Sequence, residues 1–256
     1  MERYSQHSVP NATLMLPAVI ADGGSQPRVY DFDDMVIRLV KWQPSAHGLT
    51  SAYSELIASR VGQLINAPIA RAMVVHIHMA LLPPEQRARL AQPFHVGFTY
   101  LPGSNFTAQD YARIENTAAL PAAALHLAWL QVGDQEGHNQ YLNQLEQVLP
   151  DNTRRKLNQF SLIDQACLFG SHDWSNAALD QPASPYRMPS HLKAQLSMER
   201  LAPVVQQVQS LADCDIRSCF ESYPQQWGID PRLITRAIEY TLKRRDHLAD
   251  ILRANF

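Results

Sequence analysis

The chain has no apolar run long enough to cross a bilayer, because no segment reaches about 18 uninterrupted apolar residues. Its first ten residues include Glu2, Arg3, Gln6 and His7, where a secretory signal would need an apolar stretch. The sequence therefore predicts a cytoplasmic protein that is not associated with a membrane.

Cysteine is also scarce. Cys167, Cys214 and Cys219 are the only three, and no two of them form a CxxC pair. Three cysteines cannot all be paired within one chain, and their spacing does not match a zinc-ligand pattern. These features argue against a disulfide scaffold and a cysteine zinc site, and they indicate a reducing compartment.

Neither sign of charge dominates, since 22 Lys and Arg residues stand against 24 Asp and Glu residues and the net charge is −2. The chain thus has no general positive field that would attract nucleic acid or an anionic membrane. This balance lowers the expectation of a nucleic-acid partner without excluding one.

Three common catalytic patterns are missing as well: the Walker A loop, the Rossmann glycine fingerprint and the Gly-x-Ser-x-Gly elbow of hydrolases. No internal repeat or low-complexity tract occurs, so a solenoid or coiled coil is not expected. What remains is a globular chain of 256 residues, long enough to bury one large core or two smaller cores that share a cleft.

The two halves of the chain differ in their hydrophobic pattern. Strands are expected in the first half at residues 14–20, 35–42, 72–82 and 94–101, with one long helix at residues 51–64. From residue 111 onward helical periodicity prevails, and it is clearest at residues 122–130, 153–160, 198–211, 231–242 and 244–252. Loops are expected at residues 131–141 and 177–191. We predict an α+β fold with a strand-rich N-terminal lobe, residues 1–102, and a helical C-terminal lobe, residues 103–256, joined near residues 100–103.

A glycine turn is the first feature that could carry chemistry. Gly23, Gly24 and Ser25 lie between two strand-like runs, where backbone N–H groups could approach a phosphate without a Cβ in the way. Taken alone, the same three residues are typical of an ordinary hairpin turn.

Lys41 ends the strand-like run Val36-Ile37-Arg38-Leu39-Val40, where alternation directs its side chain to one defined face. From that face a lysine could reach a phosphate pair. Glu55, in the helix expected next, could hold the ammonium in place as an ion-pair partner. The simpler alternatives are a solvated lysine at a strand end and an exposed helix carboxylate.

Two further segments could supply a catalytic base and a metal site. Asp134 and Asn139 have the Asp-x-x-x-x-Asn spacing of a phosphotransferase catalytic loop, although a polar surface loop would look the same. Asp164 follows the apolar residues Leu162 and Ile163, which suits a carboxylate ligand for Mg²⁺, or alternatively a helix cap. Each element alone is common, but their order along the chain indicates a kinase.

These segments resemble the HipA-like kinase family over residues 23–174. The resemblance is carried by Gly-Gly-Ser-Gln-Pro at 23–27, Val-Ile-Arg-Leu-Val-Lys-Trp at 36–42 and Glu-Leu-Ile-Ala-Ser-Arg-Val-Gly-Gln-Leu at 55–64. A short link that ends in proline follows at 65–68, and the Asp134 and Asp164 segments complete the set. The resemblance implies a two-lobed protein-kinase-like fold and an ATP- and Mg²⁺-dependent phosphotransferase that acts on a protein Ser or Thr.

Carried over to this sequence, the resemblance implies that Gly23, Gly24 and Ser25 cover the phosphates of ATP. Lys41 would bind the same phosphates and pair with Glu55.

In the second part of the resemblance, Asp134 would be the catalytic base, and Asn139 and Asp164 would hold Mg²⁺. The segment around Phe98 to Leu101, which includes Tyr100 and Leu101, would be the hinge that faces adenine.

Some residues depart from the family pattern. Glu136 brings negative charge near the transferred phosphoryl group, where relatives tend to have a basic residue or histidine, and Asp164 is followed by Gln165 and Ala166 instead of the Phe-Gly of ordinary protein kinases. A pseudokinase-type module that binds a nucleotide or partner without phosphoryl transfer is therefore the alternative.

A metal site at His76 and His78 is a further alternative, because both side chains would lie on one face of a strand. Neither a carboxylate nor a cysteine is near them in the sequence, so a structural role is favoured.

Overall fold

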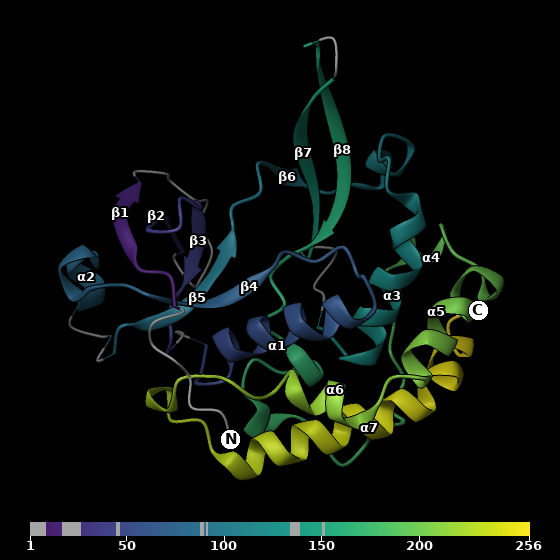
Figure 1. Ribbon diagram of the computed structural model, residues 1–256. Coiled ribbons are helices and arrows are strands. Elements are labelled where there is room, and N and C mark those ends of the chain that lie inside the picture. The colour runs from purple at the N-terminus through teal and green to yellow at the C-terminus, as the bar shows by residue number, and fades with distance from the viewer. Residues whose placement is uncertain are drawn as a thin grey trace.

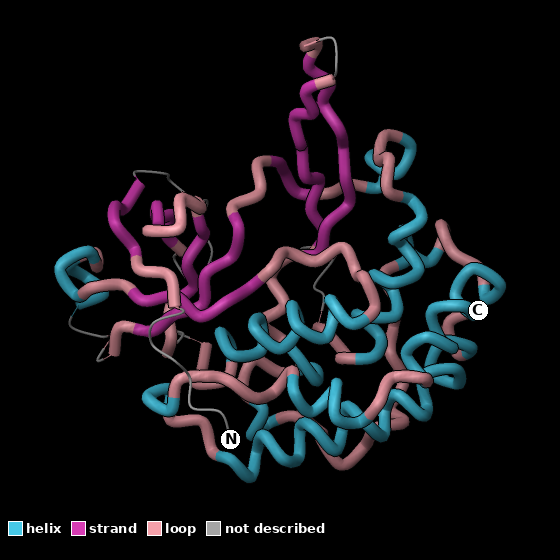
Figure 2. The backbone as a smooth tube through the Cα atoms, viewed as in Figure 1, coloured by secondary structure: helices cyan, strands magenta, loops and turns pink. Residues whose placement is uncertain are grey.

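The computed structural model describes residues 9–16, 27–44, 47–87, 90, 92–133, 139–149 and 152–256. Two antiparallel sheets and a set of helices make up this part of the chain, and the backbone passes directly from the first sheet to the second. Figure 2 shows the strands in the upper part of the view and most of the helices below and to the right of them. The predicted α+β architecture is confirmed.

The first sheet has five strands and contains most of the N-terminal part of the chain. Its spatial order is β1 (Ala12–Leu16), β2 (Arg28–Phe32), β3 (Arg38–Lys41), β5 (Phe94–Thr99) and β4 (Ala72–His76), and all neighbours are antiparallel. The strand expected at residues 72–82 ends at His76 and is followed by a 3-10 turn, Met79–Leu81. The strand β2 is not among the elements expected from the sequence.

Alternation along β3 separates two hydrophobic clusters. Val40 packs with Tyr30, Trp42 and Val75 on one face of the sheet, whereas Leu39 packs on the main core on the other face. Lys41 follows Val40 and so shares the face of Leu39. The register Lys41↔Val96 places this lysine beside the central part of β5.

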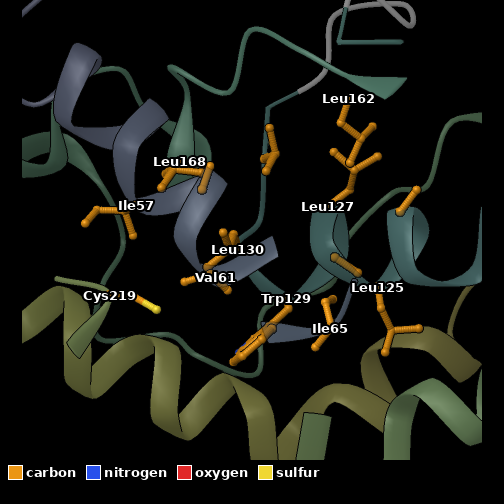
Figure 3. Packing of buried hydrophobic residues seen from close by; sticks show 14 of the residues in the cluster. Ile57, Val61, Ile65, Leu125, Leu127, Trp129, Leu130, Leu162, Leu168 and Cys219 are labelled. Carbon is orange, nitrogen blue, oxygen red and sulfur yellow. The ribbon is translucent and has the colours of Figure 1, made fainter. Parts of the chain in front are cut away.

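The helix α1 (Ser51–Leu64) covers the inner face of the sheet at β4 and β5. Its residues Ile57 and Val61 belong to the main core together with Leu127 and Leu130 (Figure 3). The helix has the bounds expected from its periodicity, and Asn66, in the left-handed region with a φ of 54°, follows its end.

The second sheet contains β6 (Gly103–Asn105), β7 (Gln140–Val148) and β8 (Arg154–Leu162) in that order, all antiparallel. The helix expected at residues 153–160 is therefore wrong, and the loop expected at 131–141 contains the start of β7. A continuous register from Gln140↔Leu162 to Val148↔Arg154 decides in favour of strands, because pairing across the hairpin overrides local propensity. The outer end of this hairpin projects from the body of the protein (Figure 1).

Helices make up most of the remaining C-terminal part. They are α3 (Leu120–Trp129), α4 (Ser190–Lys193), α5 (Met198–Gln209), α6 (Asp213–Ser218) and α7 (Pro231–Arg253); the short α2 (Pro84–Arg87) lies in the N-terminal part. Single 3-10 turns occur at Ala108–Ala112, Thr117–Ala119, Leu168–Gly170, Trp174–Asn176 and Gln225–Trp227. None of the helices that the structure describes combines the length and apolar composition needed to cross a bilayer.

The two helices expected at residues 231–242 and 244–252 form the single helix α7. Asp230 caps its first turn by accepting a hydrogen bond from the Arg232 N–H at 2.9 Å, and Pro231 occupies the first helical position. No helix breaker separates the two halves. Arg244, at the start of the second half, is buried and donates to Ala128 O at 2.8 Å. The helix α7 thereby packs along α3.

Candidate functional site

The central feature of the site is an ion-pair cluster that joins three distant segments. Lys41 Nζ donates to Glu55 Oε1 and also to Asp164 Oδ1, the latter at 2.5 Å. Lys41 ends β3, Glu55 lies in α1, and Asp164 follows β8. The sequence-based prediction that Lys41 pairs with Glu55 therefore describes the contact that the structure contains, and Asp164 joins the same cluster.

Glu55 approaches Lys41 because α1 packs across the sheet on the face to which Lys41 points. Its side chain is 1% exposed. The second carboxylate oxygen, Oε2, accepts a hydrogen bond from the Gln165 backbone N–H at 2.8 Å. Glu55 thus holds both the lysine of β3 and the backbone that follows Asp164.

Asp164 is brought to the cluster by pairing between the end of β8 and the link that joins α1 to β4. The Leu162 N–H donates to Pro68 O at 2.6 Å, and the Ala70 N–H donates to Leu162 O at 3.2 Å. The link between α1 and β4 therefore pairs with the end of β8. Two residues later Asp164 adopts a left-handed conformation with a φ of 53°, which turns the chain beside α1.

Burial and charge act in opposite directions on the three titratable groups. Burial raises the pKa of Glu55 to about 7, although the ammonium of Lys41 opposes this shift. The pKa of Lys41 is also raised, because the attraction of Glu55 and Asp164 outweighs the effect of burial. Lys41 lowers the pKa of the more exposed Asp164. The lysine is therefore positively charged between two acidic groups of different basicity.

Phe98 also contacts the lysine, with Lys41 Nζ 5.7 Å from the centre of its ring. The ring lies two pairs away along the β3 and β5 ladder, opposite Leu39. No pattern in the sequence indicates this contact, because it depends on the register between two strands that lie far apart along the chain.

Asn139 lies beside the cluster through its backbone, because its O accepts a hydrogen bond from the Ile163 N–H at 2.9 Å. Its side-chain Nδ2 donates to Gly133 O at 3.2 Å. Asn139 is 4% exposed. The structure therefore places the two predicted metal ligands, Asn139 and Asp164, on adjacent backbone segments.

Tyr100 and Leu101 lie in the segment that joins β5 of the first sheet to β6 of the second. The Tyr100 N–H donates to Ile37 O at 3.0 Å, and Leu101 O accepts a hydrogen bond from Tyr141 Oη at 3.4 Å. The segment is thus anchored to both sheets. That it faces adenine stays a prediction.

Two of the predicted elements lie outside the described residues. These are the glycine turn of Gly23, Gly24 and Ser25, and the predicted base Asp134. Their roles stay predictions.

The alternative metal site at His76 and His78 receives no support from its geometry. The His76 ring packs edge-on against Phe94, with centroids 5.4 Å apart, and His78 Nδ1 accepts a hydrogen bond from the Ala80 N–H at 3.2 Å. No group of three or more His, Cys, Asp or Glu residues that could hold a metal ion occurs in the described part of the chain.

Comparison with known proteins yields structural matches alone, since no protein-family model and no curated protein sequence matches the chain. The Helicobacter pylori proinflammatory kinase CtkA superposes with a TM-score of 0.61 at 8% identity, over 94% of this chain and 95% of that chain. The chain has a protein-kinase-like fold.

Two further solved structures are similar with TM-scores below 0.5. One is the Golgi casein kinase with Mn/ADP bound, with a TM-score of 0.49 at 7% identity over 96% of this chain and 73% of that chain. The other is HipA of Shewanella oneidensis in complex with HipB and operator DNA, with a TM-score of 0.45 at 9% identity over 86% of this chain and 61% of that chain. The predicted two-lobed kinase-like fold is confirmed by the match to CtkA, whereas membership of the HipA-like family is not shown.

Proposed function

We propose that this chain is an ATP- and Mg²⁺-dependent phosphotransferase that acts on a Ser or Thr hydroxyl of a protein. The observation that carries the proposal is the contact of Lys41 with both Glu55 and Asp164. A lysine held by a helix glutamate, next to an aspartate that follows a strand, is the arrangement that kinases use to place ATP phosphates and a metal ion. The kinase-like fold supports the same conclusion.

In this proposal the nucleotide lies between the N-terminal lobe, residues 1–102, and the C-terminal lobe, residues 103–256. Lys41 binds the phosphates, and Gly23, Gly24 and Ser25 cover them. Tyr100 and Leu101 face adenine. Phosphate oxygens would replace Asp164 as the second partner of Lys41, which frees the carboxylate of Asp164.

The proposed Mg²⁺ site fits the donor set that Asp164 and Asn139 provide. Mg²⁺ prefers oxygen ligands and is usually held by one or two carboxylates together with substrate phosphates and water. The carboxylate of Asp164 and Oδ1 of Asn139 are two such oxygens. When bound there, the ion would supply positive charge that offsets the negative charge of the phosphates.

The reaction that we propose is an in-line displacement. The acceptor hydroxyl oxygen forms a bond to the γ-phosphorus, the bond from that phosphorus to the bridging oxygen breaks, and ADP leaves. Asp134 orients the hydroxyl and takes its proton. Lys41 stabilises the negative charge that develops on the phosphate oxygens.

The test combines calorimetry of ATP binding, with and without Mg²⁺, with mass spectrometry of phosphoryl transfer to the protein itself and to generic Ser/Thr acceptors. We expect Asp134→Ala to bind ATP but to abolish transfer, and Asp164→Asn to remove the effect of Mg²⁺ on binding. Asp180→Asn replaces an exposed carboxylate outside the cluster and is the matched control. The proposal fails if wild type binds no ATP, or if transfer persists in Asp134→Ala.

The rival function is that of a module that binds a nucleotide without chemistry. Its motivation is Glu136, which brings negative charge to the loop of Asp134. Binding of ATP that does not depend on Mg²⁺, with no phosphoryl transfer by wild type, would favour the rival and reject the enzyme.

A further inference from the structure

Two buried hydroxyl groups at the start of α1 join this helix to the segment that follows Asp164. Thr50 Oγ1 donates to His172 O at 3.0 Å and accepts a hydrogen bond from the Trp174 N–H at 3.1 Å. Ser54 Oγ accepts a hydrogen bond from Trp174 Nε1 at 2.9 Å and donates to Thr50 O at 2.8 Å. Each hydroxyl is thus both a donor and an acceptor. We call these four residues, Thr50, Ser54, His172 and Trp174, the hydroxyl clasp.

The hydrogen bonds of Thr50 are unusual for its position. Thr50 is the N-cap residue of α1, where a threonine hydroxyl ordinarily accepts a hydrogen bond from the N–H of the second or third helical residue. In α1, whose residues are all described, no such bond forms, and the backbone of Thr50 is already helical, with a φ of −92° and a ψ of −10°. Its hydroxyl bonds to His172 and Trp174 instead. A residue suited to stabilise its own helix therefore connects α1 to a distant segment.

The segment that receives these bonds is itself fixed to the residues that follow α3. The Phe169 N–H donates to Leu130 O at 2.9 Å, and the Gly170 N–H donates to Gln131 O at 2.9 Å. The ring of Phe169 packs edge-on against Trp174, with centroids 5.1 Å apart, and Trp174 is buried. The hydroxyl clasp therefore ties α1 to a segment whose position is set by its bonds to the helical part of the chain.

Glu55 directly follows Ser54 in α1, so the position of this turn decides where the carboxylate lies. One carboxylate oxygen of Glu55 contacts Lys41 Nζ, and the other accepts a hydrogen bond from the Gln165 N–H at 2.8 Å. The helix is therefore attached to the segment after β8 at two places, at its start through the hydroxyl clasp and at Glu55 through the Gln165 N–H. Two points of attachment restrict both sliding and rotation of α1, whereas one would leave rotation open.

We propose that the hydroxyl clasp holds α1 in the position where Glu55 meets Lys41. Thr50 and Ser54 are then positioning residues of the candidate site. A displacement of about 1 Å in such a site can lower a reaction rate about 100-fold. The effect of the clasp on phosphoryl transfer rests on the proposed function, whereas its hold on the contact between Glu55 and Lys41 does not.

The first experiment is a double-mutant cycle measured by urea unfolding at pH 8, where Glu55 of wild type is largely ionised because its pKa is about 7. Thr50→Val keeps the shape of the side chain but leaves the buried Trp174 N–H without its acceptor, so the equilibrium constant for unfolding should rise at least about fivefold. In the Glu55→Gln background the ion pair with Lys41 is absent. The rise caused by Thr50→Val should then be at least about threefold smaller, whereas independent sites would agree within about twofold.

The second experiment measures phosphoryl transfer. Thr50→Val and Ser54→Ala should each lower kcat/KM for ATP at least about tenfold, and Thr50→Ser, which keeps the hydroxyl, should stay within about threefold of wild type. The matched control is Asp230→Ala, which removes an ordinary N-cap from α7. It should raise the equilibrium constant for unfolding about fivefold, by the same factor with and without Glu55→Gln, and leave kcat/KM unchanged.

Either of two results overturns the proposal. One is that Thr50→Val raises the equilibrium constant for unfolding by the same factor in wild type and in Glu55→Gln. The other is that Thr50→Val transfers phosphate with the kcat/KM of wild type. If wild type transfers no phosphate, the proposed function fails and the double-mutant cycle alone decides whether the clasp positions Glu55. Ser54→Ala, carried through the same cycle, keeps the test valid if Thr50→Val does not fold.

Discussion

Replacing Lys41 with methionine should destabilise the protein in a way that depends on pH. The substitution keeps an unbranched side chain that is one heavy atom shorter, and it removes the ammonium that contacts Glu55 and Asp164. Glu55 is then a carboxyl group, 1% exposed, that has lost its cation and keeps a second acidic group nearby. Removing one member of a buried ion pair typically costs about 3–5 kcal/mol.

The pH dependence follows from the protonation of Glu55. In wild type its folded-state pKa of about 7 lies above the ordinary value, so the folded state holds a proton that the unfolded state loses, and stability falls as pH rises toward 7. Loss of Lys41 raises the pKa of Glu55 further, so Glu55 of the folded variant stays protonated up to pH 8, and the free energy of unfolding falls by about 1.4 kcal/mol per pH unit over this range. In wild type Glu55 is largely ionised by pH 8, so the decrease is smaller. The cost of Lys41→Met should therefore be about 1–2 kcal/mol larger at pH 8 than at pH 6.

Urea unfolding followed by circular dichroism at pH 6 and pH 8 measures this difference directly. Groups that titrate in wild type and variant alike cancel when the two free energies of unfolding are subtracted. The double variant Lys41→Met/Glu55→Gln contains no titrating group at position 55, so its cost relative to Glu55→Gln alone should be equal at the two pH values. An equal cost of Lys41→Met alone at pH 6 and pH 8 would refute the assignment of this pH dependence to Glu55.

Three further changes test the fold at other sites by the same urea assay. Burial lowers the pKa of His95 to about 3, so this imidazole stays neutral in the folded state, whereas it is protonated in the unfolded state below about pH 6.5. The folded state therefore loses stability as pH falls. His95→Gln should reduce this loss by about 1.4 kcal/mol per pH unit between pH 6 and pH 4. Arg244→Lys should cost roughly 2–4 kcal/mol by removing charged hydrogen bonds to buried carbonyls, whereas Arg236→Lys, exposed on the same helix, should have little effect. A Cβ at Gly103 would lie 2.0 Å from Leu142 O, so Gly103→Ala should cost at least about 2 kcal/mol. An unchanged pH dependence in His95→Gln would contradict the burial of a neutral His95. An unchanged free energy of unfolding in Arg244→Lys or Gly103→Ala would contradict the hydrogen bonds of Arg244 or the close approach of Leu142 O to Gly103.

The spacing of apolar residues was sufficient to predict a helix where that spacing itself defines the buried face. The helix α1 has the predicted bounds, since its apolar residues recur at helical spacing and a link containing Asn66 and Pro68 follows it. Periodicity failed for β8, where Leu157 and Phe160 also fit a helix. The segment forms a strand because it pairs with β7 over nine residues, and such pairing cannot be predicted from the local sequence pattern.

The candidate site, too, was predicted only in part from the sequence. That Lys41, Glu55 and Asp164 share a site was predicted from their order along the chain and from a family resemblance. The direct bond between Lys41 and Asp164, the contact with Phe98 and the hydrogen bond from Gln165 to Glu55 were not predicted. Each depends on register or on the approach of segments far apart in the sequence, more than a hundred residues for Gln165 and Glu55.

The sequence by itself determined which residue types are available and in what order: a strand lysine, a helix glutamate and an aspartate after a strand. It also excluded several fold classes, because long apolar runs, repeats and cysteine pairs are absent. Tertiary structure alone decided that the α1–β4 link pairs with the end of β8, which brings Asp164 to Lys41. The physical reason is that these contacts join segments that lie far apart in the sequence. Local propensity does not determine such contacts, and they form only when both sheets and α1 pack together.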